Sequence, residues 1–246
     1  MHNKFLTFGL IILGVAAMGL PLKADFISGT LLLDDDSGYS DGGPFTALIL
    51  SGSLTEDAVN QLYSPLALAA TGDPSLVGFE TFCIETLVEF TPGNWGGPDY
   101  SVTGGFGVQQ TDGYLTEGVA WLYEQFALGN LSNIDSNFIY NTPTSNGSLQ
   151  WAIWDLIGET PAFSDPGIGS QLVTIADDAL GANVMAPVTS TSQFGVEVLE
   201  LTDGDAPAQD QLIYVDPVPD DGATVALLGV ALLGLAVFVR RLKIVV

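Results

Sequence analysis

Residues 78–90 have the sequence GFETFCIETLVEF, which is rich in β-branched and aromatic residues. Such residues fit the pleated, half-buried surface of a sheet, so the segment predicts a β-strand. It also carries Cys83, the only cysteine of the chain. The position of this strand therefore bears on both the fold and any cysteine chemistry.

Further strands are expected on both sides of this segment, where apolar residues alternate with polar ones or run together between Gly- and Asp-rich turns. They are residues 26–33, 46–54, 100–109, 193–201 and 211–215, with a loop at 203–208.

The middle of the chain changes period, because apolar residues there recur three and four positions apart, as on one face of a helix. Helices are predicted at residues 115–128, 146–157 and 170–180, and a further one at 56–70. Asn146 or Ser148 is expected to cap the second of them. Strands at both ends with helices between them indicate an α+β fold with a mainly antiparallel β-sheet and a central helical segment.

The first 24 residues, MHNKFLTFGLIILGVAAMGLPLKA, have a weakly basic start, an apolar run and a small residue at the end. This is the three-part pattern of a secretory signal peptide, with cleavage expected after Ala24. The apolar run is long, so an uncleaved signal anchor is the alternative.

The other end holds an uncharged run at residues 222–239. As a helix it would be about 27 Å long, enough for the hydrocarbon core of a bilayer. Arg240, Arg241 and Lys243 follow and are expected to stay on the cytoplasmic side. We therefore expect a single membrane helix here rather than a buried core helix.

The residues before this run are Val218, Pro219, Asp220, Asp221 and Gly222. Motif, apolar helix and basic end together resemble a PEP-CTERM sorting signal, in the variant whose motif is VPDSG, with Asp221 in place of the serine. The resemblance implies processing by an exosortase in the inner membrane, followed by delivery to the cell surface or the extracellular matrix. It implies nothing about activity.

Four parts of the chain follow from these observations. They are a signal peptide at 1–24, an acidic α+β domain at 25–202, a last strand and linker at 203–217, and the sorting signal with its membrane helix at 218–246.

The charges are distributed unevenly. The 5 Lys and Arg residues and the single His all lie in the terminal signals, whereas all 29 Asp and Glu lie from Asp25 to Asp221. Without histidine the domain has no Ser-His-Asp or Cys-His catalysis and no ordinary zinc site. Without basic residues it has no means of holding a nucleic-acid backbone. We expect no nucleic acid, no cofactor and no resident metal.

Two short segments carry the remaining candidate chemistry: Phe82-Cys83-Ile84, and Gln150-Trp151-Ala152-Ile153-Trp154. Together, across residues 79–159, they resemble bacterial thioester domains. The resemblance implies that Cys83 and Gln150 condense with loss of ammonia, although their spacing of 67 positions is compact for such domains.

Further expectations follow for this bond. Gln150 is placed in the first turn of its helix, where unpaired N–H groups would stabilise the oxyanion. Phe82, Trp151 and Trp154 are expected to shield the bond from water. Its target would be an amine on another surface or in an exopolysaccharide matrix, which makes the protein a covalent adhesin and not an enzyme.

Two alternatives remain open. The protein is a structural matrix or envelope component without chemistry, in which Cys83 and Gln150 are packing residues. Alternatively, a pair among Glu80, Glu85, Glu89 and Glu159 serves glycoside hydrolysis, with Glu85 and Glu89 on one strand face.

Acidic loops at 34–41 and 203–205 have oxygen ligands suited to Ca²⁺ but match no EF-hand, so solvated loops are expected.

Overall fold

The computed structural model describes residues 28–34, 44–52, 77–86, 88, 100–105, 114–159, 163–189 and 193–215. The predicted signal helix, the helix expected at 56–70 and the C-terminal signal with its membrane helix lie outside these residues. Within the described part of the chain, no helix has the length and apolar character needed to cross a membrane.

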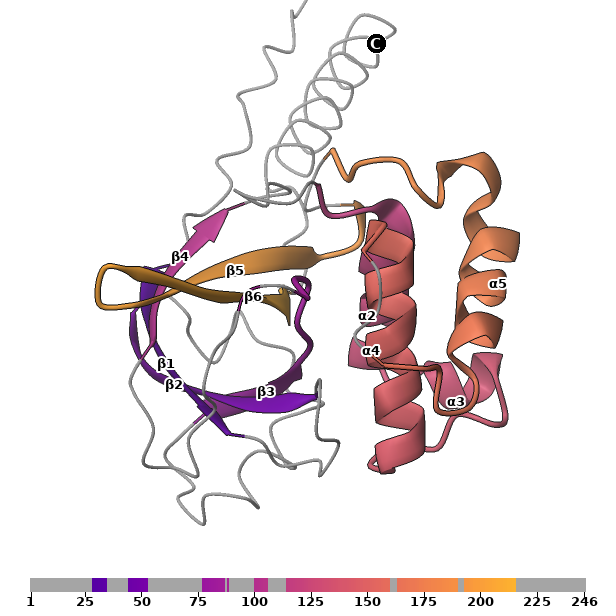
Figure 1. Ribbon diagram of the computed structural model, residues 1–246, viewed down its shortest axis with the longest axis horizontal. Coiled ribbons are helices and arrows are strands. Elements are labelled where there is room, and N and C mark those ends of the chain that lie inside the picture. Colours follow the sequence, from indigo (N-terminus) through magenta and orange to yellow (C-terminus); the bar gives the residue numbers. More distant parts are fainter. Residues whose placement is uncertain are drawn as a thin grey trace, which may run out of the picture.

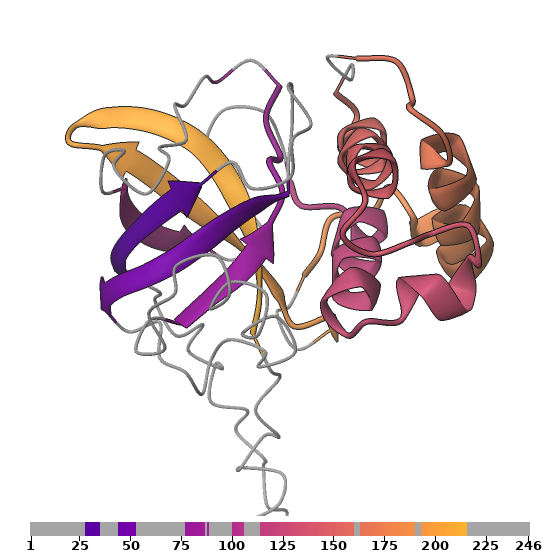
Figure 2. The ribbon, with the colours of Figure 1, turned by 90° about the horizontal axis from the view of Figure 1, so that it is seen from below.

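Six strands form one sheet in which every neighbouring pair is antiparallel. In chain order they are β1 (Ser28–Asp34), β2 (Phe45–Gly52), β3 (Val77–Thr81), β4 (Tyr100–Gly105), β5 (Val196–Asp203) and β6 (Ala206–Tyr214). Their order across the sheet is β3-β2-β1-β4-β5-β6. The sheet curls strongly, so that its two edge strands, β3 and β6, approach each other (Figures 1 and 2).

The helices lie together on one side of the curled sheet (Figures 1 and 2). They are α2 (Glu117–Ala127), α3 (Leu131–Ile134), α4 (Pro143–Ile157) and α5 (Gly169–Leu180), followed by a short 3₁₀ turn, η1 (Gly181–Asn183). The α+β class with an antiparallel sheet and a central helical segment is thus confirmed for the described residues.

Helix α4 starts earlier than its sequence predicts. Thr142 caps it through its side chain, which accepts a hydrogen bond from the Ser145 N–H, and Pro143 follows in the first turn. Proline suits this position because the N–H it lacks would have no partner inside the helix. The predicted caps Asn146 and Ser148 are therefore wrong, and both residues lie buried within the helix.

The strand predicted at 78–90 is shorter than expected, because β3 ends at Thr81. The chain then turns toward β6, where Ile84 N–H donates to Asp210 O and Leu212 N–H donates to Phe82 O, both at 3.2 Å. Cys83 and Gln211 face each other in this single bridge. Glu85 therefore does not continue β3, so its predicted placement on one strand face with Glu89 is wrong; Glu89 itself lies outside the described residues.

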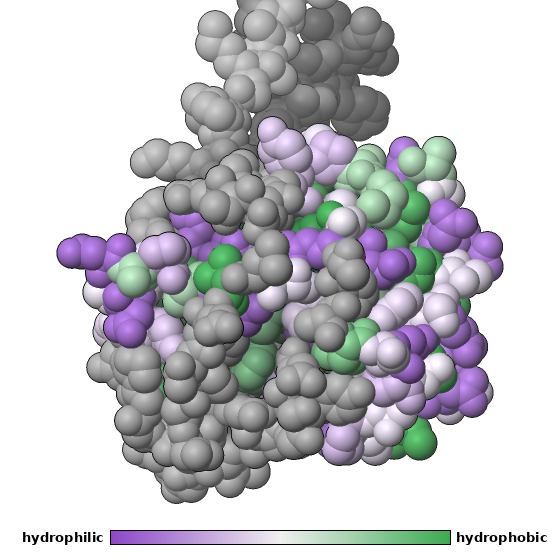
Figure 3. Space-filling model, in the orientation of Figure 1, coloured by the Kyte–Doolittle hydropathy of each residue, from purple (hydrophilic) through white to green (hydrophobic). Residues whose placement is uncertain are grey.

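The loop expected at 203–208 is a tight hairpin instead. Strand β5 runs to Asp203 and β6 begins at Ala206, with Gly204 turning the chain at a φ of +61° that suits glycine. The hairpin tip is exposed and hydrophilic (Figure 3).

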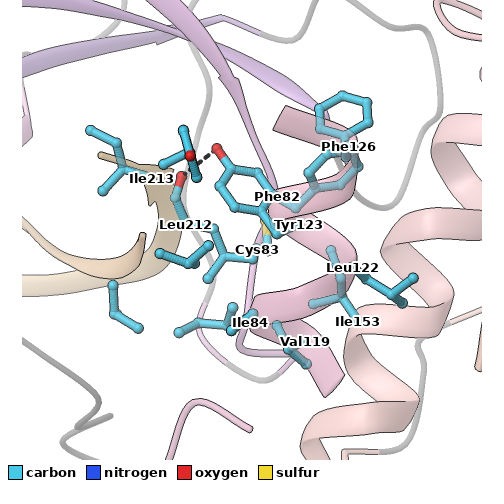
Figure 4. Close-up of a cluster of buried hydrophobic side chains, with 14 of the residues drawn as sticks. Phe82, Cys83, Ile84, Val119, Leu122, Tyr123, Phe126, Ile153, Leu212 and Ile213 are labelled. Atoms are coloured by element: carbon cyan, nitrogen blue, oxygen red, sulfur yellow. Dashed lines mark hydrogen bonds between the residues drawn. The ribbon is translucent and has the colours of Figure 1, made fainter. Parts of the chain in front are cut away.

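The main core lies between the sheet and the helices. Phe126 of α2 sits at its centre, with ring centroids 5.0 Å from Phe82 and 5.4 Å from Tyr140. Figure 4 shows Phe82, Tyr123 and Phe126 grouped beside Cys83, with Leu212 and Ile213 of β6 on the other side. Cys83 is therefore built into the contact between the two layers.

Candidate functional site

Cys83 lies just after β3, where the two ends of the curled sheet meet, and is 1% exposed. The residues on either side of Cys83 form backbone hydrogen bonds with β6, through Phe82 O and the Ile84 N–H. Because backbone groups alternate in direction along an extended chain, the N–H and C=O of Cys83 point away from β6, toward the helical layer.

Gln150 of α4 meets these two groups with its carboxamide. Its Oε1 accepts from the Cys83 N–H at 3.0 Å, and its Nε2 donates to the Cys83 carbonyl at 2.7 Å. Gln150 is fully buried. The structure thus brings together the two residues that the sequence singles out, but through the main chain of Cys83.

The position of Gln150 along its helix differs from expectation. It lies in the middle of α4, beyond the first turn, where backbone N–H groups are already bonded within the helix. The predicted oxyanion stabilisation by the start of this helix is therefore wrong. The N–H group that contacts the Gln150 carbonyl oxygen belongs to Cys83.

Gln211 of β6 is the residue that meets the thiol. Its Nε2 lies 3.4 Å from Cys83 Sγ and also donates to Gln209 O at 3.3 Å. Its Oε1 accepts from the Thr81 hydroxyl at 3.4 Å, and that hydroxyl also donates to Leu212 O at 2.6 Å. The side chain of Gln211 is fully buried.

Sequence reasoning did not single out Gln211. A signal was present, because polar residues recur at 209, 210 and 211 just before the apolar end of β6. All three are buried, and buried polar side chains need partners. The polar run could therefore mark a strand with buried partners, although its place beside Cys83 depends on the sheet topology.

Tyr123 ties three elements together around the site. From α2, its hydroxyl donates to Glu80 O of β3 at 2.8 Å and to Leu212 O of β6 at 3.1 Å. Burial raises the pKa of Tyr123 well above its ordinary value, with the Glu80 carboxylate adding to the effect and a bond to Thr81 opposing it. The phenol therefore stays neutral and remains a donor.

Two buried carboxyl groups lie beside the bridge. Glu85 Oε2 accepts from the Asp210 N–H at 2.9 Å, and Gln209 Nε2 donates to Glu85 O. Asp210 Oδ1 accepts from the Leu201 N–H of β5 at 3.3 Å. Glu85 and Asp210 are 2% and 7% exposed. Burial and the Glu85 charge raise the pKa of Asp210 to about 8, with a smaller contribution from Glu200 and an opposing one from the Leu201 N–H.

The three predicted shielding residues lie in different surroundings. Phe82 is fully buried against Tyr123 and Phe126. Trp154 is 1% exposed, lies 5.5 Å from the Phe163 ring, and its indole N–H has no hydrogen-bond partner. Trp151 is half-buried against the start of α5, where a Cβ added to Gly169 would lie 2.7 Å from the indole.

The other candidate residues are spread out. Glu159 accepts from the Thr86 N–H at 2.5 Å, and Glu80 is half-buried on β3. Asp203 and Asp205 lie at the exposed hairpin tip. Among the described residues, no three His, Cys, Asp or Glu side chains are grouped to hold a metal ion. The sorting motif, the basic stop and the 34–41 loop beyond residue 34 lie outside the described part.

One comparison with known proteins identifies a feature of this chain. Residues 217–242 match the VPDSG-CTERM motif. No curated protein and no solved structure matches the chain. The chain therefore carries a C-terminal sorting signal, which implies export, membrane-associated processing and an exosortase-type enzyme as a partner.

Proposed function

We propose that this exported, exosortase-sorted surface protein attaches covalently to amine-bearing partners through an internal thioester at Cys83. One observation carries the proposal: the buried Cys83 sulfur lies against the carboxamide of Gln211, while Gln150 holds the Cys83 main chain from the opposite side. Two glutamines thus meet at Cys83, Gln211 at its thiol and Gln150 at its main chain.

The proposed condensation needs no oxidant and no cofactor. Cys83 Sγ attacks the carboxamide carbon of a glutamine, a C–S bond forms and the C–N bond breaks. The nitrogen leaves as ammonia and takes the thiol proton with it. A partner amine later attacks the same carbon, so that a C–N bond forms, the C–S bond breaks, and a proton of the amine returns to the sulfur.

The contacts favour Gln211 over Gln150 as the acyl donor. The group that would leave from Gln211, its Nε2, is 3.4 Å from Sγ. Both polar atoms of the Gln150 carboxamide are engaged by the Cys83 backbone, and loss of its nitrogen would leave the Cys83 carbonyl without that bond. Gln150 is better suited to position Cys83, although the pair Cys83–Gln150 suggested by the sequence remains the competing assignment.

Local groups support the reaction at Gln211. The Thr81 hydroxyl lies 3.4 Å from Gln211 Oε1, where negative charge develops in a tetrahedral intermediate, and it would turn its single proton from Leu212 O to stabilise that charge. Burial of Cys83 and Gln211 keeps water away from the product bond. Phe82 and the apolar core around it contribute to this exclusion.

The target amine has to come from outside the domain. Residues 25–239 contain no Lys, Arg or His, so apart from a chain N-terminus nothing in this region offers an amine. An amine-bearing protein surface or exopolysaccharide matrix would supply one. The dense negative charge would also attract a partner with protonated amines.

The experiment is intact-mass spectrometry of the full chain with a Cys83→Ala variant as the matched control. We expect the parent alone to lack the mass of one ammonia and to regain mass as an adduct when methylamine is added. Fragmentation then shows which glutamine carries the methylamide, Gln211 or Gln150. A full mass together with an alkylatable Cys83 would refute the thioester.

A second candidate is favoured by the same hydrogen bonds. Because the Gln150 carboxamide satisfies both backbone groups of Cys83, the cluster also suits a sorted structural protein in which these residues only stabilise the fold. The mass measurement decides between the two, since a purely structural role predicts no loss of ammonia.

A further inference from the structure

We propose that the buried carboxyl groups of Glu85 and Asp210 form a proton-dependent clamp that holds Cys83 opposite Gln211 and opens when Asp210 loses its proton. The clamp would regulate the proposed thioester site, so its effect on thioester formation rests on the proposed function. The opening of the clamp itself does not. Its physical behaviour can be tested in a protein that forms no thioester.

The clamp lies where regular strand pairing has ended. Beyond Thr81 only a single bridge joins the chain to β6, with bonds from Ile84 N–H to Asp210 O and from Leu212 N–H to Phe82 O. The Glu85 carboxylate adds a bond to the Asp210 N–H, and Gln209 adds one to Glu85 O. These contacts secure residues 82–85 on β6.

The charged side chains that act on Asp210 are both acidic. They are Glu85, from the segment after β3, and Glu200 of β5, while the Leu201 N–H of β5 donates to the Asp210 carboxyl. None of the described residues is a Lys, Arg or His. A negative charge on Asp210 therefore meets no neighbouring cation in the described part of the chain.

Loss of the proton would place two negative charges together in a buried site. Removing carboxylates from water is costly, and like charges add repulsion. The raised pKa of Asp210, about 8, agrees with a proton retained at neutral pH. Separation of residues 82–85 from β6 would hydrate both groups, and it would also move the Cys83 sulfur away from the Gln211 carboxamide.

The sign of the pH dependence follows from proton binding. The closed state keeps the Asp210 proton up to about pH 8, whereas a hydrated carboxyl loses it near its ordinary value of 3.8. Between these values opening releases a proton. The opening equilibrium should therefore rise about tenfold per pH unit and level off above about pH 8.

The test is hydrogen exchange of the Ile84 and Leu212 amides in the full chain carrying Cys83→Ala, with a chelator present. Protection is expressed relative to the intrinsic exchange rate at each pH. We expect it to fall about tenfold per unit between pH 6 and 8. The Leu172 amide of α5, bonded to Ile168 O, should keep its protection.

Two variants and one control complete the test. Asp210→Asn should remove the pH dependence, and Glu85→Gln should move the levelling point to lower pH, because the Glu85 charge contributes to the raised pKa of Asp210. Asp178→Asn, on the exposed side of α5, should behave like the parent.

An unchanged slope in Asp210→Asn, a flat profile in the parent, or an equal loss of protection at Leu172 would overturn the clamp. Because Cys83→Ala forms no thioester, these outcomes are independent of the intact-mass result. The proposed function can thus fail while the clamp stands, and the reverse also holds.

Discussion

Replacement of Gln150 by leucine tests the positioning of Cys83 directly. The substitution keeps the approximate size of the side chain but removes both partners of the Cys83 main chain, which lie at 3.0 and 2.7 Å. Both residues are buried, so water cannot easily replace these bonds. Each unsatisfied buried group costs about 1–3 kcal/mol, so the free energy of unfolding should fall by about 2–6 kcal/mol.

The assay is urea denaturation in a Cys83→Ala background, which keeps the backbone groups of residue 83 and excludes any covalent bond. Gln150→Glu is the matched control. Its protonated carboxyl can accept from the N–H and donate to the carbonyl of residue 83, whereas its ionised form can only accept. The control should therefore regain stability as the pH falls, and Gln150→Leu should not.

A loss below about 1 kcal/mol for Gln150→Leu would refute this reasoning, because one unsatisfied buried group alone should cost that much. It would mean that the carboxamide does not hold the Cys83 backbone. The role given to Gln150 in the proposed function would then fail as well.

Three further changes in unfolding free energy are expected, each measured by urea denaturation. Tyr123→Phe removes the hydroxyl that bonds Glu80 O and Leu212 O, but Leu212 O keeps its bond from Thr81, so the loss should be about 0.5–1.5 kcal/mol; no loss would mean that the hydroxyl does not join the layers. Asp165→Ala removes an acceptor for three N–H groups at the start of α5, and should cost about 0.5–2 kcal/mol. Because these bonds outweigh burial and lower the pKa of Asp165, its contribution should weaken in acid, and a variant as stable as the parent would contradict the capping role. Gly118→Ala places a Cβ 2.8 Å from both Val184 Cγ2 and Val184 O, so a loss of about 1–3 kcal/mol is expected, and an unchanged protein would show that this contact yields freely.

Much of the fold follows from local patterns in the sequence. The apolar period at 115–128 and 170–180 corresponds to α2 and α5, and the alternation at 193–201 overlaps β5, which runs from Val196 to Asp203. Each of these elements buries a face in the core, so the spacing of its apolar residues follows the period of a helix or a strand and predicts the element. The start of α4 was missed because Thr142 and Pro143, which fix it, stand before the apolar pattern begins.

The end of β3 depends on contacts that no local pattern contains. Residues 82–86 have a composition suited to a strand, yet the backbone groups of Phe82 and Ile84 bond to β6, more than 120 positions away, and those of Cys83 bond to Gln150 of α4. The pairing results from the curl of the sheet. Propensity describes which residues tolerate extended geometry, while tertiary contacts decide where regular pairing stops.

The candidate site was partly predictable for the same reason. Cys83 and Gln150 stand out because cysteine is unique in the chain and the glutamine lies in a Trp-rich segment. Gln211 is 128 positions from Cys83 and reaches it only because β6 meets the segment after β3. Its role depends on the topology of the sheet, which the sequence periods do not specify.

The bridge between Cys83 and Gln211 also determines how the domain would respond to mechanical tension. Gln211 lies near the end of β6, and the sorting signal begins at residue 217, so a pull from the C-terminal side enters the domain through this strand. With the amide product at Gln211, that pull would pass from β6 to the attached partner over a few residues. The helices and the other strands would be largely bypassed, so attachment would outlast their unfolding and would not be limited by the forced-unfolding rate of the domain.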